Sequence, residues 1–178
     1  MNKKDNQERV SNRLRVSQRN VKGISTKVQE SKRPTIEVLY ASEDTPRLVQ
    51  HGDWIDLAVD EDVDLKRKGD MQHVSLGVAM KLPDGYEAII AERSSTHKKK
   101  GVDLANGIGI IDNAYQGNDD VWCAELVANR SRVHIDRGER VLQFRIVPSM
   151  SRLVPDLQIN EVEQLEGVNR GGFGSTGR

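Results

Sequence analysis

The sequence has little material for covalent or metal-based stabilisation. It contains one cysteine, Cys123, and four histidines among 178 residues. A single cysteine excludes an internal disulfide framework and any zinc site built from several cysteines. Four scattered histidines do not favour a structural metal cage. Aromatic residues make up only 4% of the chain, so we expect a core that is mostly aliphatic.

Long apolar runs are also missing. The chain has no apolar stretch of about 18 residues, which excludes a membrane-spanning helix. Its first residues contain no apolar segment of the kind found in secretory signal peptides. We therefore expect a cytoplasmic protein without a membrane partner.

The formal net charge of zero conceals an asymmetry. Residues 1–33 carry ten Lys/Arg and three Asp/Glu, a charge of +7, whereas residues 34–178 carry 17 and 24, a charge of −7. The polar, basic segment 1–33 is expected to be a disordered or loosely helical tail, with a nucleic-acid-binding arm as the functional alternative. We expect a β domain over residues 34–168 and a flexible, glycine-rich arm over residues 169–178.

From Thr35 onward the hydrophobic pattern has a period of two. Apolar residues alternate most clearly over 74–82, which predicts one half-buried strand. Pro83–Gly85 supplies turn chemistry, and Glu87–Glu92 is expected to be the returning strand. Further strands are predicted over residues 36–40, 121–128 and 140–147.

Only residues 94–101 indicate a helix, with serines as N-cap candidates and Gly101 as the stop. Many short strands and one short helix predict an all-β barrel or sandwich. Arg93, Ser94 and Ser95 stand where a strand passes into that helix, and a helix N-terminus attracts phosphate. The alternative is a helix cap beside a surface arginine.

Residues 106–117 form the densest candidate segment. Two glycines in an apolar strand allow another group to approach the backbone closely. Asp112 follows three apolar positions, so partial burial is expected. Its carboxylate would orient a water molecule as a general base, or it would begin an Asx turn; the segment alone favours neither.

Three other segments carry weaker signals. Asp56 lies between Ile55 and Leu57, and a solvated strand face is the favoured interpretation of that segment alone. Gln143 faces away from its apolar neighbours and would brace a ligand or contact water. In residues 170–178, glycine amides and hydroxyl groups can surround phosphate oxygens, although a loose chain end is the alternative.

The order of these segments resembles the five-motif series of the trimeric dUTP diphosphatases (dUTPases). Residues 53–57, 92–95, 106–117, 138–143 and 172–177 correspond to motifs one to five, and the resemblance spans residues 36–178. It implies a jelly-roll-like β subunit, a homotrimer with shared active sites, and conversion of dUTP and water to dUMP and pyrophosphate. Such an enzyme keeps uracil out of DNA and supplies dUMP for dTMP synthesis. Mg²⁺ would be bound across the triphosphate.

The resemblance also implies residue roles. Asp112 would deprotonate the water that attacks the α-phosphorus, and the Tyr115 ring would leave no room for a 2′-hydroxyl group. Asp56 would hold a metal-bound water or an active-site arginine rather than the metal itself. The implied substrate-binding residues are Arg93, Ser94, Ser95, Asn106, Gly109, Ile110, Ile111, Tyr115, Gln143, Arg170, Phe173, Gly174, Ser175 and Thr176.

The sequence departs from the family pattern at several positions. Trp54-Ile55 replaces the usual Gly-Tyr before Asp56, and Glu92 stands where proline usually precedes the motif-two arginine. Arg170 precedes Phe173 by three residues instead of five, which leaves its phosphate role open, and Arg178 could substitute for it.

Two rival functions remain. A dCTP deaminase, alone or combined with dUTPase activity, shares this fold but needs a glutamate at the pyrimidine ring, for which Glu125 is the only candidate. A regulatory binding protein of the same fold would use the nucleotide as a switch for a protein partner.

Overall fold

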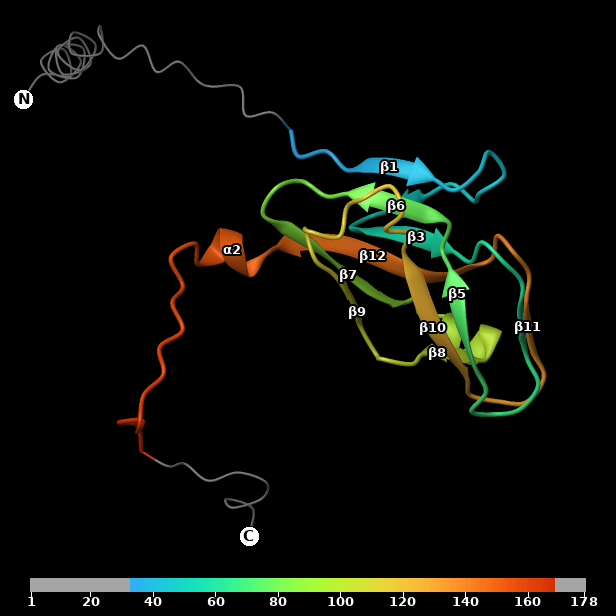
Figure 1. Ribbon diagram of the computed structural model, residues 1–178. Helices are drawn as coiled ribbons and strands as arrows, with labels where there is room; N and C mark the ends of the chain where they lie inside the picture. The colour runs from blue at the N-terminus through green and yellow to red at the C-terminus, as the bar shows by residue number, and fades with distance from the viewer. Residues whose placement is uncertain (1–32, 169–178) are drawn as a thin grey trace, which may run out of the picture. The chain divides into compact units, whose positions relative to one another are not determined.

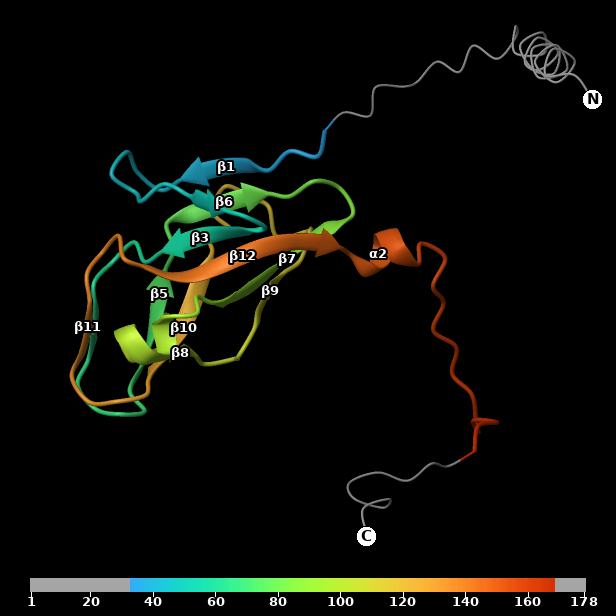
Figure 2. The ribbon, with the colours of Figure 1, turned by 180° about the vertical axis from the view of Figure 1, so that it is seen from behind.

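The computed structural model describes residues 33–168 (Figures 1 and 2). The compact unit that contains the strands begins at Thr35. The expectations for the basic tail, Arg170, Phe173 and the Gly174–Thr176 segment concern residues outside the described range. Within that range, no helix is long and apolar enough to cross a membrane.

Strands dominate the described chain, which confirms the all-β prediction. The strands are β1 (Glu37–Tyr40), β2 (Val49–His51), β3 (Trp54–Ala58), β4 (Val63–Leu65), β5 (Met71–Ser75), β6 (Val78–Lys81), β7 (Tyr86–Glu92), β8 (Val102–Leu104), β9 (Gly109–Ile111), β10 (Cys123–Ala128), β11 (Val133–Ile135) and β12 (Arg140–Pro148). Two short helices accompany them, η1 (Thr96–Lys100) and α2 (Met150–Leu153).

All strand pairs are antiparallel and form four sheets. The largest has the order β2-β3-β12-β7-β9, and a three-stranded sheet has the order β5-β10-β8. The pairs β1-β6 and β4-β11 form two-stranded sheets. Figure 1 shows β12 running through the middle of the fold, with β7 and β9 on one side and β3 on the other.

The core between these sheets is mostly aliphatic, as the composition predicts. Its two aromatic members are Trp122 and Phe144, whose ring centroids lie 5.1 Å apart at an interplanar angle of 76°. This edge-to-face arrangement is favourable for aromatic pairs. Both residues are fully buried together with Leu57, Ile90 and Leu142, so β3, β7 and β12 contribute to a single core.

The alternating segment 74–82 is two strands, so the prediction of one continuous strand is wrong. Its apolar positions are all buried, but Gly77 has φ +66° and breaks the strand between β5 and β6. A Cβ atom at Gly77 would lie 2.5 Å from Oδ2 of Asp60 and 2.7 Å from Cγ2 of Thr45. β5 therefore pairs with β10, whereas β6 pairs with β1.

The turn at Pro83–Gly85 is present, with Tyr86 N–H bonded to the Pro83 carbonyl at 3.1 Å. The strand that follows does not return along its predecessor, because β7 pairs with β12 and β9. The turn thus connects two sheets.

The predicted helix is η1, a five-residue π-helix that ends at Gly101, whose φ is +76°. Ser95 precedes it without a side-chain capping hydrogen bond, so the hydroxyl-cap expectation is wrong. The expectation of a single short helix is also incomplete, because α2 follows β12.

Gly77→Ala should lower the free energy of unfolding by about 2–5 kcal/mol, since positive φ costs about 1–2 kcal/mol and overpacking adds about 1–3 kcal/mol. Gly69→Ala is the matched control: Gly69 has φ +89°, but a Cβ atom added there would have no neighbouring atom within 4 Å. Urea unfolding of both variants measures the difference. Equal losses would contradict the role assigned to the Asp60 contact.

Candidate active site

The register of β12 brings two predicted site residues, Asp56 and Gln143, together. Gln143 pairs with Asp56 on β3 and with Ala91 on β7. Its Nε2 donates a hydrogen bond of 2.9 Å to the carbonyl oxygen of Glu92. Since residues directly opposite on antiparallel strands face the same side of the sheet, Asp56 and Gln143 lie side by side.

Asp56 forms an ion pair with Arg93. Nε of Arg93 lies 3.0 Å from Oδ1 of Asp56, and Nη1 of Arg93 donates to the Arg140 carbonyl at 3.0 Å. Asp56 is only 4% exposed, so the solvated strand face favoured by its own segment is wrong. Its Oδ2 is buried and has no hydrogen-bond partner within residues 33–168, which leaves an acceptor available to a ligand or a water molecule.

The turn after Arg93 is fixed mainly by a buried threonine. Thr96 is fully buried, and its Oγ1 donates to the Val141 carbonyl at 2.5 Å. Ser94 is exposed and Ser95 half-buried. The two serines therefore follow Arg93 on a turn that Thr96 anchors to β12.

Glu92, which replaces the usual proline, has a structural role that the sequence did not reveal. Its Oε1 accepts a hydrogen bond of 2.7 Å from the Leu104 backbone N–H. This bond joins the end of β7 to the end of β8, two residues before Asn106. The Glu92 carboxylate thus links the turn that begins at Arg93 to the loop that leads into β9.

That loop presents its side chains outward. Asn106 is exposed, as are Ile108 (51%) and Ile110 (63%). The group that approaches Gly109 closely is a side chain of the same domain: a Cβ atom at Gly109 would lie 3.1 Å from Cβ of Ile90. Glycine therefore allows β9 to pack against β7 at the edge of the large sheet.

Asp112 follows β9 at the surface, so its expected partial burial is wrong for the single chain. Its Oδ1 accepts the Ala114 N–H at 2.7 Å, an Asx turn. The next residue, Asn113, donates through Nδ2 to the carbonyl oxygens of Pro83 and Tyr86, both at 3.0 Å. The β6–β7 turn therefore holds the loop that carries Asp112, while Oδ2 of the carboxylate has no role in this turn.

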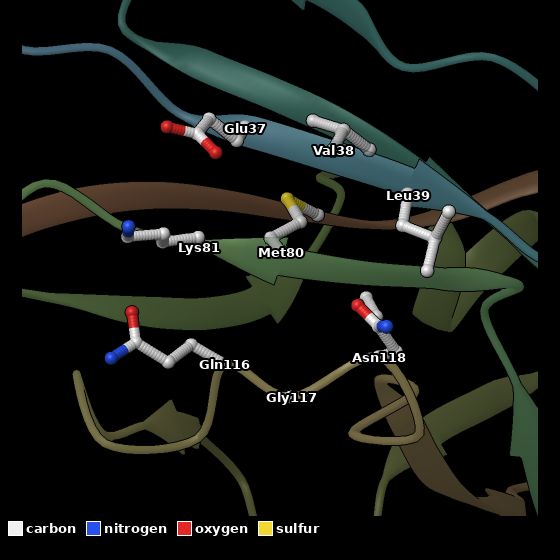
Figure 3. A pocket seen from close by; sticks show the side chains of 9 residues that line it. Glu37, Val38, Leu39, Met80, Lys81, Gln116, Gly117 and Asn118 are labelled. Carbon is white, nitrogen blue, oxygen red and sulfur yellow. The ribbon is translucent and has the colours of Figure 1, made fainter.

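Tyr115 lies on the same loop, 41% exposed, and its hydroxyl group donates to the Val121 carbonyl at 3.3 Å. The chain then runs along an open hollow that lies between residues 116–118 and the β1–β6 sheet. Figure 3 shows Gln116 and Asn118 along one side of this hollow, facing Lys81 and Leu39. The hollow adjoins the Asp112 loop but is lined by none of the predicted site residues.

The predicted site residues fall into two groups on one chain. Asp56, Arg93 and Gln143 gather where β3, β12 and β7 pair, whereas Asp112 follows Ile111, which pairs with Ala88. Arg93 lies five residues beyond Ala88, and at about 3.3 Å per residue the two groups are roughly 16 Å apart along β7. One chain alone does not bring them together.

No group of three or more His, Cys, Asp or Glu residues within residues 33–168 is arranged to hold a metal ion. The unpartnered Oδ2 of Asp56 is one carboxylate oxygen beside a guanidinium group. Mg²⁺ is commonly bound by one or two carboxylates together with substrate phosphates. The residues therefore fit a metal ion held mainly by a bound phosphate chain.

The Asp56–Arg93 pair should couple energetically, because Asp56 is buried and Arg93 is about one-third exposed (side chains 5% and 34%). A double-mutant cycle of Asp56→Ala and Arg93→Ala should give a coupling energy of about 0.5–3 kcal/mol in urea unfolding. A value near zero would show that the pair does not stabilise the free protein.

Comparison with known proteins identifies the family. The sequence matches the dUTPase family over residues 54–177. It is 44% identical over 144 residues to the SPbeta prophage-derived deoxyuridine 5′-triphosphate nucleotidohydrolase YosS of Bacillus subtilis (strain 168), covering 80% of this chain and 97% of that protein. It is 39% identical over 125 residues to the deoxyuridine 5′-triphosphate nucleotidohydrolase of Hydrogenobaculum sp. (strain Y04AAS1), covering 69% and 82%.

Solved structures of dUTPases are similar to this chain. The dUTPase from Streptococcus mutans matches with a TM-score of 0.56 and 28% identity, covering 71% of this chain and 98% of that one. The dUTPase of Staphylococcus bacteriophage 80alpha with dUPNHPP matches in fold, with a TM-score of 0.61 and 23% identity, covering 81% and 99%. The motif series, the β-strand architecture and these matches lead to one conclusion: the chain belongs to the dUTPase family.

Proposed function

We propose that this protein hydrolyses dUTP to dUMP and pyrophosphate in the cytoplasm. The observation that carries the proposal is the combination of an Asp56–Arg93–Gln143 group with a separately anchored Asp112, on a chain 44% identical to a named deoxyuridine 5′-triphosphate nucleotidohydrolase. No observation favours the deaminase or the regulatory binding protein. Glu125, the deaminase candidate, is exposed on β10 opposite His73.

Asp112 is the proposed general base. Its Oδ1 is held by the Ala114 N–H, so Oδ2 is the oxygen that takes the proton from the attacking water. The water then attacks the α-phosphorus, the α–β phosphoanhydride bond breaks, and pyrophosphate leaves. A positioned general base contributes about 10²–10⁴ to the rate.

Arg93 and Gln143 are the proposed phosphate ligands, with Ser94 and Ser95. Because Asp56 and the Arg140 carbonyl already hold the Arg93 guanidinium group, its orientation does not depend on substrate. Preorganised donors stabilise charge that develops during reaction. Asp56 Oδ2 would help to hold a Mg²⁺ ion through a water molecule, and that ion would supply positive charge to neutralise the triphosphate.

The pyrimidine would be read by the loop before and along β9. Asn106 and the backbone of Gly109, Ile110 and Ile111 would form hydrogen bonds with the uracil edge. The Tyr115 ring would pack against deoxyribose and exclude a 2′-hydroxyl group. We also propose that residues 169–178 close over the bound nucleotide through Phe173, Gly174, Ser175 and Thr176, with Arg170 or Arg178 on phosphate, and that residues 1–33 are not needed for catalysis.

A homotrimer would unite the two groups of residues. The roughly 16 Å along β7 between Arg93 and Asp112 is too far for both to act on one phosphate of a nucleotide bound to a single chain. Exposed apolar side chains on β9 and along residues 150–168 support assembly, since large exposed apolar patches mark contact sites. Those that follow β12 and are at least half exposed are Met150, Leu153, Leu157, Ile159, Val162, Leu165 and Val168.

Pyrophosphate release from dUTP, UTP, dTTP and dCTP tests the proposed substrate. We expect dUTP to be hydrolysed far faster than the other three, because the uracil edge and the missing 2′-hydroxyl group are both recognised. Ammonia release from dCTP is measured in the same samples. Robust ammonia release, or equal turnover of UTP and dUTP, would contradict the proposal.

Mixed trimers test the shared site. Asp112→Asn alone should retain nucleotide binding while kcat falls by about 10²–10⁴, and Arg93→Ala alone should also be nearly inactive. If each site combines Asp112 of one chain with Arg93 of another, unfolding and refolding the two variants together should restore part of the activity.

The control is each variant refolded by itself, which should stay inactive. Light scattering confirms that all preparations contain trimers. Mixed trimers as inactive as the single variants would show that both residues act from the same chain.

A further inference from the structure

Nearly half of the domain's positive charge lies in three short segments. Residues 34–178 contain 17 Lys/Arg against 24 Asp/Glu. Eight of these 17 cations lie in residues 66–68, 98–100 and 130–132. These three segments comprise nine residues, and the one that is not a cation is Ser131. The set contains no acid and no apolar side chain. We call these nine residues the basic cluster.

Folding brings the three segments together at one end of the domain. The Arg132 N–H donates to the Lys66 carbonyl at 3.1 Å, which joins the β10–β11 and β4–β5 connections. The Arg130 guanidinium group donates to the carbonyl oxygens of Lys98 at 3.4 Å and Lys99 at 2.9 Å. Figures 1 and 2 show both connections side by side beyond β5 and β10.

Few carboxylates neutralise this cluster. In residues 33–168, Arg67 lies 3.7 Å from Asp70 and Lys100 pairs with Glu139. The other six cations of the cluster are exposed and have no acidic partner in this part of the chain. Like charges that are held together without counter-charge create a local positive potential, here on a domain whose overall charge is −7.

The composition of the cluster indicates the kind of partner. It lacks aromatic side chains, so it offers no platform on which unpaired bases could stack. It also lacks apolar side chains that would enter a membrane or fill a protein pocket. Exposed lysines and arginines on adjoining turns suit a row of phosphates, which are contacted without regard to base sequence.

We propose that the basic cluster binds the phosphate backbone of duplex nucleic acid, through residues other than the proposed nucleotide ligands. The negative charge on the rest of the domain repels a polyanion, so binding is directed to this end of the molecule. Within residues 33–168, no ion pair joins the side chain of Lys66, Lys68 or Lys98 to a proposed site residue, so their replacement leaves dUTP turnover unchanged.

The test compares three full-length proteins in binding a DNA duplex of about 20 base pairs, followed by fluorescence anisotropy over a series of salt concentrations. They are the wild type, the cluster variant Lys66→Ala/Lys68→Ala/Lys98→Ala, and a control variant Arg47→Ala/Lys81→Ala/Arg145→Ala. The control loses the same charge from exposed positions outside the cluster. Residues 1–33 are present in all three, so their contribution cancels.

Each phosphate contact contributes about 0.9 to the slope of log K against log salt. The cluster variant should therefore lower that slope by about 2–3 and weaken binding at least about tenfold near 100 mM salt, while the control changes the slope by less than about 1. Equal losses in both variants, or no loss in either, would overturn the proposal. So would a loss of dUTP turnover in the cluster variant, or weaker binding to vesicles of phosphatidylserine with DNA binding intact.

Discussion

Strand β12 is the constraint on which the rest of the structure depends. It has hydrogen-bonded neighbours on both edges, β3 and β7, and it supplies Leu142 and Phe144 to the core. A bulge between Arg140 and Leu142 lets Val141 turn inward as well, where its carbonyl accepts from Arg93 N–H and Thr96 Oγ1. A shift of one residue in this register would send Gln143 to the opposite face. The strand pairing that closes the core therefore also places Asp56, Arg93 and Gln143 next to one another.

The sequence was sufficient where a structural signal is local. The hydrophobic pattern predicted β1, β7, β10 and β12, because one face of each strand is more buried than the other. The three-residue strands β2, β4, β8 and β11 were not predicted. The same pattern could not reveal the break at Gly77. That break depends on Asp60 and Thr45, which are distant in sequence and crowd the glycine only after folding. Strand partners were equally hidden, since hydrogen bonding between β6 and β1 or between β7 and β12 leaves no mark in either segment alone.

The motif series predicted the residues of the candidate site, and in the folded chain these residues lie in two groups. The burial of individual side chains could not be predicted from single segments. Asp56 has the pattern of a solvated strand residue but is buried against Arg93. Asp112 has the pattern of a partly buried residue but is exposed. Both errors have one cause. Burial of a polar side chain is decided by partners on other strands or on other chains. The structural role of Glu92 could not be predicted for the same reason, because its hydrogen-bond partner Leu104 lies on a different strand.

The hydrogen bond from Ala114 to Asp112 has a consequence for conformational entropy. A free carboxylate on a surface loop samples several rotamers, and selecting one of them during the reaction raises the activation barrier. Here the backbone amide has already selected the rotamer, and the bonds from Asn113 to Pro83 and Tyr86 have fixed the loop beneath it. The entropy cost of ordering this side chain is thus met when the protein folds, so the proposed proton transfer to Asp112 would begin from a carboxylate with few conformations left to lose.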